Sequence, residues 1–419
     1  MTKKLLVVRS PQGLLLIINI LALLLLMTFN IEFEKNILFI AIALIFTIFL
    51  SSQVLYKISN GDTYIFLIVT MLISIGIIMI YRINPALGFK QVIWFGVGII
   101  VFFISYFTIK YIKHWDKLLY FYLGISLALF IATLIFGTKN KGATNWIIIF
   151  GSSFQPAELI KVLFIFSLAS YYVNKEKYNS WKYSRLIYIA AVYIHIGFLF
   201  IQKDLGTAML FFLLFMSILY VYEEDRRLLL YNSAGAVVLS VAGYFLFNHV
   251  RVRIETWLNP WTDIGGKGYQ ITQSLFAIAS GGFFGTGIGL GHPAFIPEVH
   301  NDFIFSAICE EMGVLTGIAV IFLFMIIVYR GVKIALQQQN QFFRIVALGI
   351  TLMFGYQAFI ILGGVTKMIP LTGITLPFVS YGGSSLVSSF AALGILQLAS
   401  EEFDVEQEDE DEHRIQEDN

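Results

Sequence analysis

Apolar runs of membrane-spanning length recur along nearly the whole of this 419-residue chain. A run of about 20 apolar residues can cross the roughly 30 Å hydrocarbon core of a bilayer as one helix. Only 13% of the residues are charged, whereas soluble domains contain about 25%. The sequence therefore predicts an all-α polytopic membrane protein with twelve transmembrane helices, near residues 13–29, 37–56, 63–81, 91–109, 117–136, 156–173, 185–202, 205–222, 229–248, 303–329, 343–364 and 384–400.

The distribution of Lys and Arg predicts the orientation, because cytoplasmic loops carry an excess of basic residues. With the N-terminus inside, the cytoplasmic segments hold 17 of the 28 basic residues, the outer segments hold ten, and Lys161 lies within a span. Both termini are then cytoplasmic. Residues 401–419 hold 11 of the 27 acidic residues. We expect them to form a disordered, solvated tail that either improves solubility or binds a partner.

The large outer loop between the ninth and tenth helices is too polar and too rich in Gly to span the membrane. Function in such proteins often resides in ordered loops of this kind. If a helix begins near Asp302, then Asp302, Ser306 and Glu310 lie on one face, because they are four residues apart. Asp302 could cap this helix or act as a general base at the outer surface. His300 beside it is a candidate metal ligand.

Two further charged groups lie inside or at the rim of predicted spans. Glu158 and Lys161 are three residues apart on a helix that Pro156 can begin, so they can pair. Unpaired charge at this depth is costly. The two residues are therefore either a structural ion pair or the polar wall of a substrate cavity. Asp204 stands at a predicted helix start, where a carboxylate caps backbone N–H groups, and a direct role in ligand binding is the alternative. The single cysteine, Cys309, excludes an internal disulfide framework.

Six ordered stretches together resemble the SEDS family, the RodA, FtsW and SpoVE proteins of bacterial cell elongation, division and sporulation. They are GATNWI with FQPAELIK (142–161), KDLGTA (203–208), RVRIETWLNP (251–260), GYQITQSLFAIASGGFFGTGIG (268–289), IPEVHNDFIFSAICEEMG (296–313) and GGVTKMIPLTGITLPFVSYGGSS (363–385). The likeness covers about 63–400 in the family's order and spacing. Asn145 departs from the family, which usually has Arg there, and this removes a candidate phosphate contact. Two further departures, at Lys203 and Asn301, leave the neighbouring carboxylates in place.

The resemblance implies a ten-helix core over residues 61–400 that polymerises lipid II into glycan strands on the outer face of the cytoplasmic membrane. Residues 1–60 would be an added pair of transmembrane helices, and 401–419 the cytoplasmic tail. The implied partners are a class B penicillin-binding protein, which crosslinks the strands, the substrate lipid II and membrane lipids, with no nucleic acid. The function is expected to serve cell elongation or division.

The resemblance also assigns roles to individual residues. Asp302 matches the position thought to remove the proton from the attacking hydroxyl. Because an α-linked donor gives a β-linked product, one inverting displacement with one base suffices. The leaving diphosphate needs positive charge near it, and a divalent cation such as Mg²⁺ or Mn²⁺ is a further candidate for that charge. The expected substrate-binding residues are Gln155, Glu158, Lys161, Asp204, Arg251, Arg253 and Ser384.

Two alternatives belong to other functional classes. In a lipid II flippase or transporter, Glu158 and Lys161 would act as gating groups. A scaffold would only position the crosslinking enzyme, and replacing Asp302 would then leave cell-wall synthesis intact.

Overall fold

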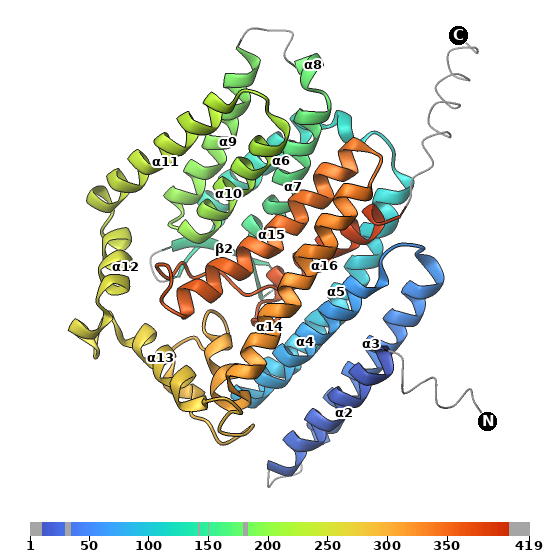
Figure 1. The fold of residues 1–419 in the computed structure, drawn as a ribbon, viewed down its shortest axis with the longest axis vertical. Coiled ribbons are helices and arrows are strands. Elements are labelled where there is room, and N and C mark those ends of the chain that lie inside the picture. The colour runs from blue at the N-terminus through green and yellow to red at the C-terminus, as the bar shows by residue number, and fades with distance from the viewer. Residues whose placement is uncertain (1–10, 30–34, 141–142, 150, 179–182, 402–419) are drawn as a thin grey trace.

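The computed structural model describes residues 11–29, 35–140, 143–149, 151–178 and 183–401. Within these residues, ten helices are long and apolar enough to cross a membrane, and two shorter apolar helices cover Gly13–Ala22 and Gly383–Ala399. All twelve predicted ranges coincide with a helix (Figure 1): α2 (Pro11–Phe29), α3 (Lys35–Ile58), α4 (Thr63–Ile83), α5 (Pro85–Tyr111), α6 (Leu119–Phe136), α7 (Pro156–Val173), α9 (Ser184–Ile201), α10 (Leu205–Tyr222), α11 (Arg226–Leu246), α14 (Ile304–Gln337), α15 (Gln341–Val365) and α16 (Gly383–Ala399). Apart from Glu401, the predicted acidic tail lies outside the described residues.

Side-chain caps fix where several spans begin. Asp62 accepts a hydrogen bond from the N–H of Tyr64 at the start of α4. Asn84 caps α5, which has a proline in its first turn, and Asn340 caps α15. Such caps satisfy backbone N–H groups that a helix leaves without an internal partner. Pro156 stands in the first turn of α7 as the sequence predicts.

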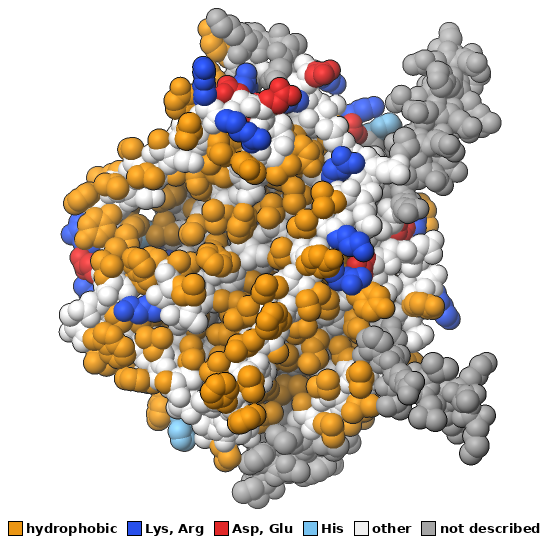
Figure 2. All heavy atoms as spheres, in the orientation of Figure 1, with side chains coloured by type: hydrophobic (Ala, Val, Ile, Leu, Met, Phe, Trp, Pro, Cys, Tyr) orange, Lys and Arg blue, Asp and Glu red, His pale blue; other side chains and the backbone are white. Residues whose placement is uncertain are grey.

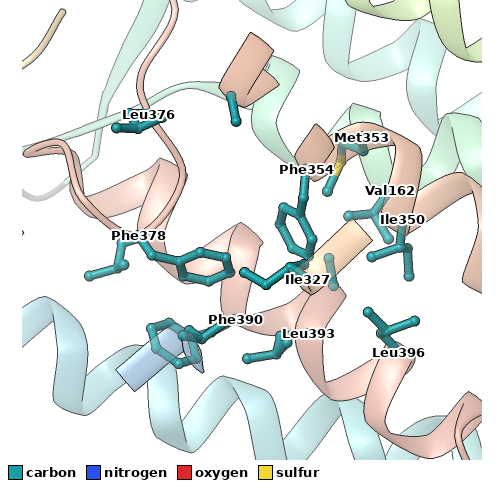
Figure 3. Close-up of a cluster of buried hydrophobic side chains, with 14 of the residues drawn as sticks. Val162, Ile327, Ile350, Met353, Phe354, Leu376, Phe378, Phe390, Leu393 and Leu396 are labelled. Carbon is teal, nitrogen blue, oxygen red and sulfur yellow. The ribbon is translucent and has the colours of Figure 1, made fainter. Parts of the chain in front are cut away.

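One part of the buried core is built from large apolar side chains of α7, α14, α15, α16 and the loop before α16. Figure 3 shows such a cluster, in which Phe378 points toward Phe390 and Phe354. The Phe378 ring centroid lies 5.1 Å from that of Phe354 and 5.6 Å from that of Phe390. These rings and their aliphatic neighbours are almost fully buried. Aromatic pairs at such distances add to the free energy gained by burial. The buried Phe378 side chain therefore holds the loop between α15 and α16 against the bundle.

Other helices present apolar side chains outward. In α11, Leu230, Val237 and Phe245 are more than half exposed, and only Asn232 and Gly243 are buried. Figure 2 shows apolar side chains over most of one face, with charged side chains gathered at one end near α8 (Lys175–Tyr178). An extended apolar surface of this kind is what a bilayer-spanning bundle presents to the lipid. The chain is a multi-pass membrane protein.

Shorter elements that the apolar runs did not predict lie between the spans. The segment between α6 and α7 forms an antiparallel three-stranded sheet in the order β1 (Thr138–Asn140), β2 (Ala143–Ile149) and β3 (Ser152–Phe154). The large loop contains α12 (Asn248–Leu258) and α13 (Tyr269–Gly281). The 3₁₀ turns are η1 (Trp115–Lys117), η2 (Pro260–Asp263) and η3 (Pro293–Phe295).

Helix α14 is interrupted at Gly313, where φ is 85° and ψ is 162°. The glycine-rich loop that follows α13 supplies hydrogen bonds at this break. The N–H of Val314 donates to the Gly282 carbonyl over 2.9 Å, and the N–H of Thr286 donates to the Glu310 carbonyl over 2.9 Å. The break therefore leaves these backbone groups paired, as buried backbone groups require. It also fixes the N-terminal part of α14 against α13.

Candidate active site

Five segments converge on one side of the bundle. They are the first turns of α7 and α10, helix α12, the turn before α14, and the loop between α15 and α16 (residues 366–382). Their contacts bring together most of the charged residues singled out in the sequence.

Asp204 stands at the N-cap of α10 and is buried. Its Oδ1 accepts a hydrogen bond from the N–H of Thr207 over 3.1 Å, and Gln155 Nε2 donates to its Oδ2 over 3.1 Å. The predicted capping role is confirmed, and Gln155 adds a link to the start of α7. Burial raises the pKa of the Asp204 carboxyl, and hydrogen bonds from Thr207 oppose this rise.

Arg253 extends from α12 to the loop between α15 and α16, where its Nη1 donates to the Thr372 carbonyl over 2.7 Å. Burial lowers the pKa of the Arg253 guanidinium, and the carboxylates of Asp204 and then Asp302 oppose this shift. The charge of Arg253 thus interacts with two carboxylates, those of Asp204 and Asp302, which are 98 residues apart in the sequence. We call Arg253, Asp204 and Asp302 the Arg253 cluster.

Asp302 is half-buried in the turn before α14. A methyl group built on Gly373 would lie 3.6 Å from Asp302 Oδ2 and 3.7 Å from Arg253 Nη2. Gly373 has φ of 78°, a conformation that favours glycine. Its lack of a side chain leaves room beside both charged groups.

The expected register of α14 needs correction. The helix begins at Ile304 with Phe303 at its N-cap, so Asp302 lies in the preceding turn and shares no helical face with Ser306 and Glu310. The Ser306 hydroxyl pairs with that of Ser274 at 2.7 Å, and Glu310 Oε1 accepts from the N–H of His292 over 2.8 Å. These two residues hold α13 and the glycine-rich loop in place.

Glu158 and Lys161 form the predicted pair, with Lys161 Nζ 2.8 Å from Glu158 Oε2. Their side chains are only 8% and 4% exposed, respectively. The predicted ion pair is confirmed, and its role as the wall of a substrate cavity stays a prediction. The Ser388 hydroxyl also donates to Glu158 Oε2, over 3.0 Å, which ties α16 to α7. Both charges act on the pKa of Asp204, so the pair borders the Arg253 cluster.

Other predicted contacts differ in their surroundings. Ser384 is buried at the start of α16, and its hydroxyl has no hydrogen-bond partner among the described residues. Arg251 lies on another side of α12, where its Nη2 donates to the Phe245 carbonyl over 3.1 Å and its guanidinium lies 6.0 Å from the Tyr244 ring centroid. The structure thus brings Arg253 into the cluster and leaves Arg251 apart from it.

His300 provides little basis for a metal site. Its Nε2 lies 3.9 Å from Glu298 Oε2, and its ring packs against Tyr381 with centroids 5.8 Å apart. In the part of the chain that the structure describes, no three His, Cys, Asp or Glu residues group so as to hold a metal ion.

Asn145, where the SEDS family usually has Arg, forms a structural hydrogen bond. With its amide nitrogen facing Gln202, it donates to that residue's carbonyl over 2.8 Å.

Sequence reasoning missed the residues that frame the cluster. Thr372 accepts the hydrogen bond from Arg253, and a methyl group on Gly206 would lie 3.1 Å from Thr372 Cβ. Burying these small or uncharged residues costs little free energy, so nothing in the sequence distinguishes them as charged residues near a span are distinguished. The TGITLP stretch of the SEDS-like motif at 372–377 was the available signal.

The chain is similar to known proteins in both sequence and structure. Residues 62–404 match the cell cycle proteins FtsW, RodA and SpoVE. The chain is 32% identical over 363 residues to the peptidoglycan glycosyltransferase RodA of Mycobacterium tuberculosis (strain ATCC 25618 / H37Rv), covering 80% of this chain and 77% of that protein. It is 35% identical over 363 residues to stage V sporulation protein E of Bacillus subtilis (strain 168), covering 81% and 97%. A solved structure described as "Structural coordination of polymerization and crosslinking by a peptidoglycan synthase complex" is similar with a TM-score of 0.69 and 26% identity, covering 81% of this chain and 98% of that one.

Proposed function

The chain belongs to the cell cycle protein family of FtsW, RodA and SpoVE, and we propose that Asp302 is the general base with which this peptidoglycan glycosyltransferase polymerises lipid II. The assignment rests on the Arg253 cluster. In it, the half-buried carboxylate of Asp302, in the turn before α14, lies beside the guanidinium of Arg253 from α12. A base and a cation side by side fit a reaction that removes a proton while a diphosphate leaves.

The reaction has a simple balance of bonds. The 4-hydroxyl oxygen of the incoming GlcNAc attacks the anomeric carbon of the growing chain, and the bond from that carbon to the polyprenyl diphosphate breaks. Asp302 takes the hydroxyl proton, and the electron pair of the broken bond stays on the diphosphate. A single displacement inverts the anomeric centre, so a second nucleophilic carboxylate has no role.

The other residues of the site act on charge and position. Arg253 stabilises the negative charge that develops on the leaving diphosphate. Asp204 orients Arg253 electrostatically and fixes the start of α10. Glu158, Lys161, Gln155 and Ser384 complete the polar wall next to the cluster.

The described residues do not group as a protein-bound metal site. A divalent cation such as Mg²⁺ or Mn²⁺ would therefore be held mainly by the phosphates of the donor, next to the Asp204 or Asp302 carboxylate. Its effect would add to the positive charge that Arg253 supplies.

We place the enzyme in the cytoplasmic membrane, with both termini in the cytoplasm and the Arg253 cluster on the outer side. The excess of Lys and Arg on the opposite side supports this orientation. Residues 61–400 form the catalytic core, preceded by the helix pair of 1–60. The similarity to a structure of a peptidoglycan synthase complex supports a class B penicillin-binding protein as its crosslinking partner.

The direct test is polymerisation by the purified full-length protein. Lipid II is incubated with the protein alone and with its cognate transpeptidase, and glycan strands are resolved by gel electrophoresis. We expect strands to form and the yield to rise with the partner. Transfer of lipid II across vesicles without any polymer would instead indicate a flippase, and polymer that appears only from the partner would indicate a scaffold. A parallel reaction with chelator shows whether a divalent cation takes part.

A further inference from the structure

Two loops that are distant in the sequence are joined directly beside Asp302. The N–H of Tyr381 donates to the His300 carbonyl over 2.8 Å. The Ser380 hydroxyl donates to the Asn301 carbonyl over 2.6 Å. The two carbonyls immediately before Asp302 are thus both held by the loop that leads into α16.

Ser380 is itself fixed within its own turn. Its hydroxyl accepts a hydrogen bond from the N–H of Leu376 over 2.9 Å, and its N–H donates to the Leu376 carbonyl over 3.0 Å. The residue is 5% exposed. Phe378, within the same turn, has φ of 65°, and its side chain is buried between Phe354 and Phe390 (Figure 3). The aromatic core therefore anchors the turn that carries Ser380.

A buried glutamine of α5, Gln91, forms hydrogen bonds to the backbone at the end of the same turn. Gln91 is fully buried. Its Nε2 donates to the Ser380 carbonyl over 3.1 Å, and its Oε1 accepts from the N–H of Gly382 over 3.4 Å. A side-chain amide buried in a membrane bundle is costly unless it is hydrogen-bonded. Both ends of this amide are used on one loop, on either side of Tyr381.

We propose that Ser380 and Gln91 are positioning residues for Asp302. The Gln91 amide fixes the backbone of residues 380–382 through its two hydrogen bonds. Ser380 and Tyr381 in turn hold the carbonyls of residues 301 and 300. These contacts keep Asp302 in place beside Arg253. Neither side chain is part of the Arg253 cluster. This inference rests on the proposed role of Asp302 as the base.

The expected effect is on turnover rather than on substrate affinity. A displacement of about 1 Å at a catalytic group can reduce the rate about 10²-fold, while contacts that bind the lipid and the sugars elsewhere are unchanged. Ser380→Ala removes the donor to Asn301 and the acceptor for Leu376. Gln91→Leu removes both hydrogen bonds of the amide and puts an apolar side chain of similar size in its place.

The test uses the purified full-length protein with its transpeptidase partner and lipid II. We expect Ser380→Ala and Gln91→Leu to lower kcat by about 10–100-fold with KM little changed, and Ser380→Thr, which keeps the hydroxyl, to recover most of the loss. Ser74→Ala is the matched control, because Ser74 is 1% exposed and its hydroxyl donates only within its own helix, to Thr70 over 2.7 Å. Its kcat should match the wild type.

Amide hydrogen exchange gives a readout that is independent of activity. Residues 298–303 should exchange faster in Ser380→Ala and Gln91→Leu than in the wild type, while α16 and the melting temperature change little. If Ser380→Ala does not fold, Gln91→Leu decides the question alone, since it leaves Ser380 intact. Wild-type kcat and exchange in Gln91→Leu, or a rise in KM at constant kcat, would overturn the proposal.

Asp302→Asn, measured alongside, separates the two possible failures. If Asp302→Asn keeps near-normal activity, the proposed base is wrong whatever the other variants do. If Asp302→Asn is inactive while Ser380→Ala and Gln91→Leu are normal in rate and exchange, only the positioning role is wrong.

Discussion

Arg253 and Arg251 stand two residues apart in α12, yet their surroundings differ. Two residues along a helix turn the side chain by about 200°, so one arginine faces the cluster and the other faces the end of α11. The carboxylates of Asp204 and Asp302 act on the pKa of Arg253, whereas Arg251 contacts Phe245 and Tyr244. From the sequence alone the two were equivalent candidates, because α12 and its register were not predicted.

This difference predicts unequal effects of the same substitution. Arg253→Ala should lower the polymerisation rate by about 10²-fold, the usual cost of losing one group that stabilises developing negative charge. Arg251→Ala, the matched control in the same helix, should stay near the wild-type rate. Both rates are measured on purified protein with lipid II. Equal losses in the two variants would mean that Arg251 also contacts the substrate.

Among the elements, the long helices were predictable and the short ones were not. Apolar runs such as 63–81 and 343–364 can only be spans, and α4 and α15 follow them closely. The three-stranded sheet and α13 are too short to appear as apolar runs of membrane-spanning length, so the apolar pattern did not predict them. The break at Gly313 was likewise hidden, because it depends on contact with the loop after α13.

The Gly313 break predicts a strong local requirement for glycine. A methyl group there would lie 2.3 Å from the Phe283 carbonyl oxygen, at a φ of 85°. Gly313→Ala should lower the free energy of unfolding by roughly 1–3 kcal/mol or more, since both strain and a clash are introduced. Thermal unfolding in detergent checks this. Gly124→Ala, at a helix position with no atom within 4 Å of the new methyl group, should be neutral or slightly stabilising.

At the scale of the whole molecule, the proposed orientation in the membrane rests on the distribution of Lys and Arg. The charged residues of the Arg253 cluster were recognisable in the sequence because charge near a span is costly and therefore informative. Their assembly was not, because it needs α12 and the 366–382 loop to fold over the ends of α7 and α10. Uncharged residues such as Gln91 and Ser380 left no comparable signal.

The proposed orientation predicts which residues react from outside the cell. Cys309 is the only cysteine and is 2% exposed, so the natural background of labelling should be low. Lys267→Cys, at an exposed position in the outer loop, should react with an impermeant thiol reagent in whole cells. Lys177→Cys, exposed in α8 at the other end, should react only after lysis. The reverse pattern would contradict the topology.

The central claim is that Asp302 is the base for glycan polymerisation, and its most direct test is the rate of Asp302→Asn with purified protein and lipid II. This change keeps the size of the side chain and its ability to accept a hydrogen bond, but removes the basic carboxylate. We predict a loss of about 10²–10⁴-fold, partial activity in Asp302→Glu, and a normal rate in Asp263→Asn, which changes an exposed carboxylate of the same loop that accepts from the N–H of Lys267. Near-normal glycan synthesis by Asp302→Asn would contradict the account, and Asp204, Glu298 and Glu310 would then be the next candidates for the base.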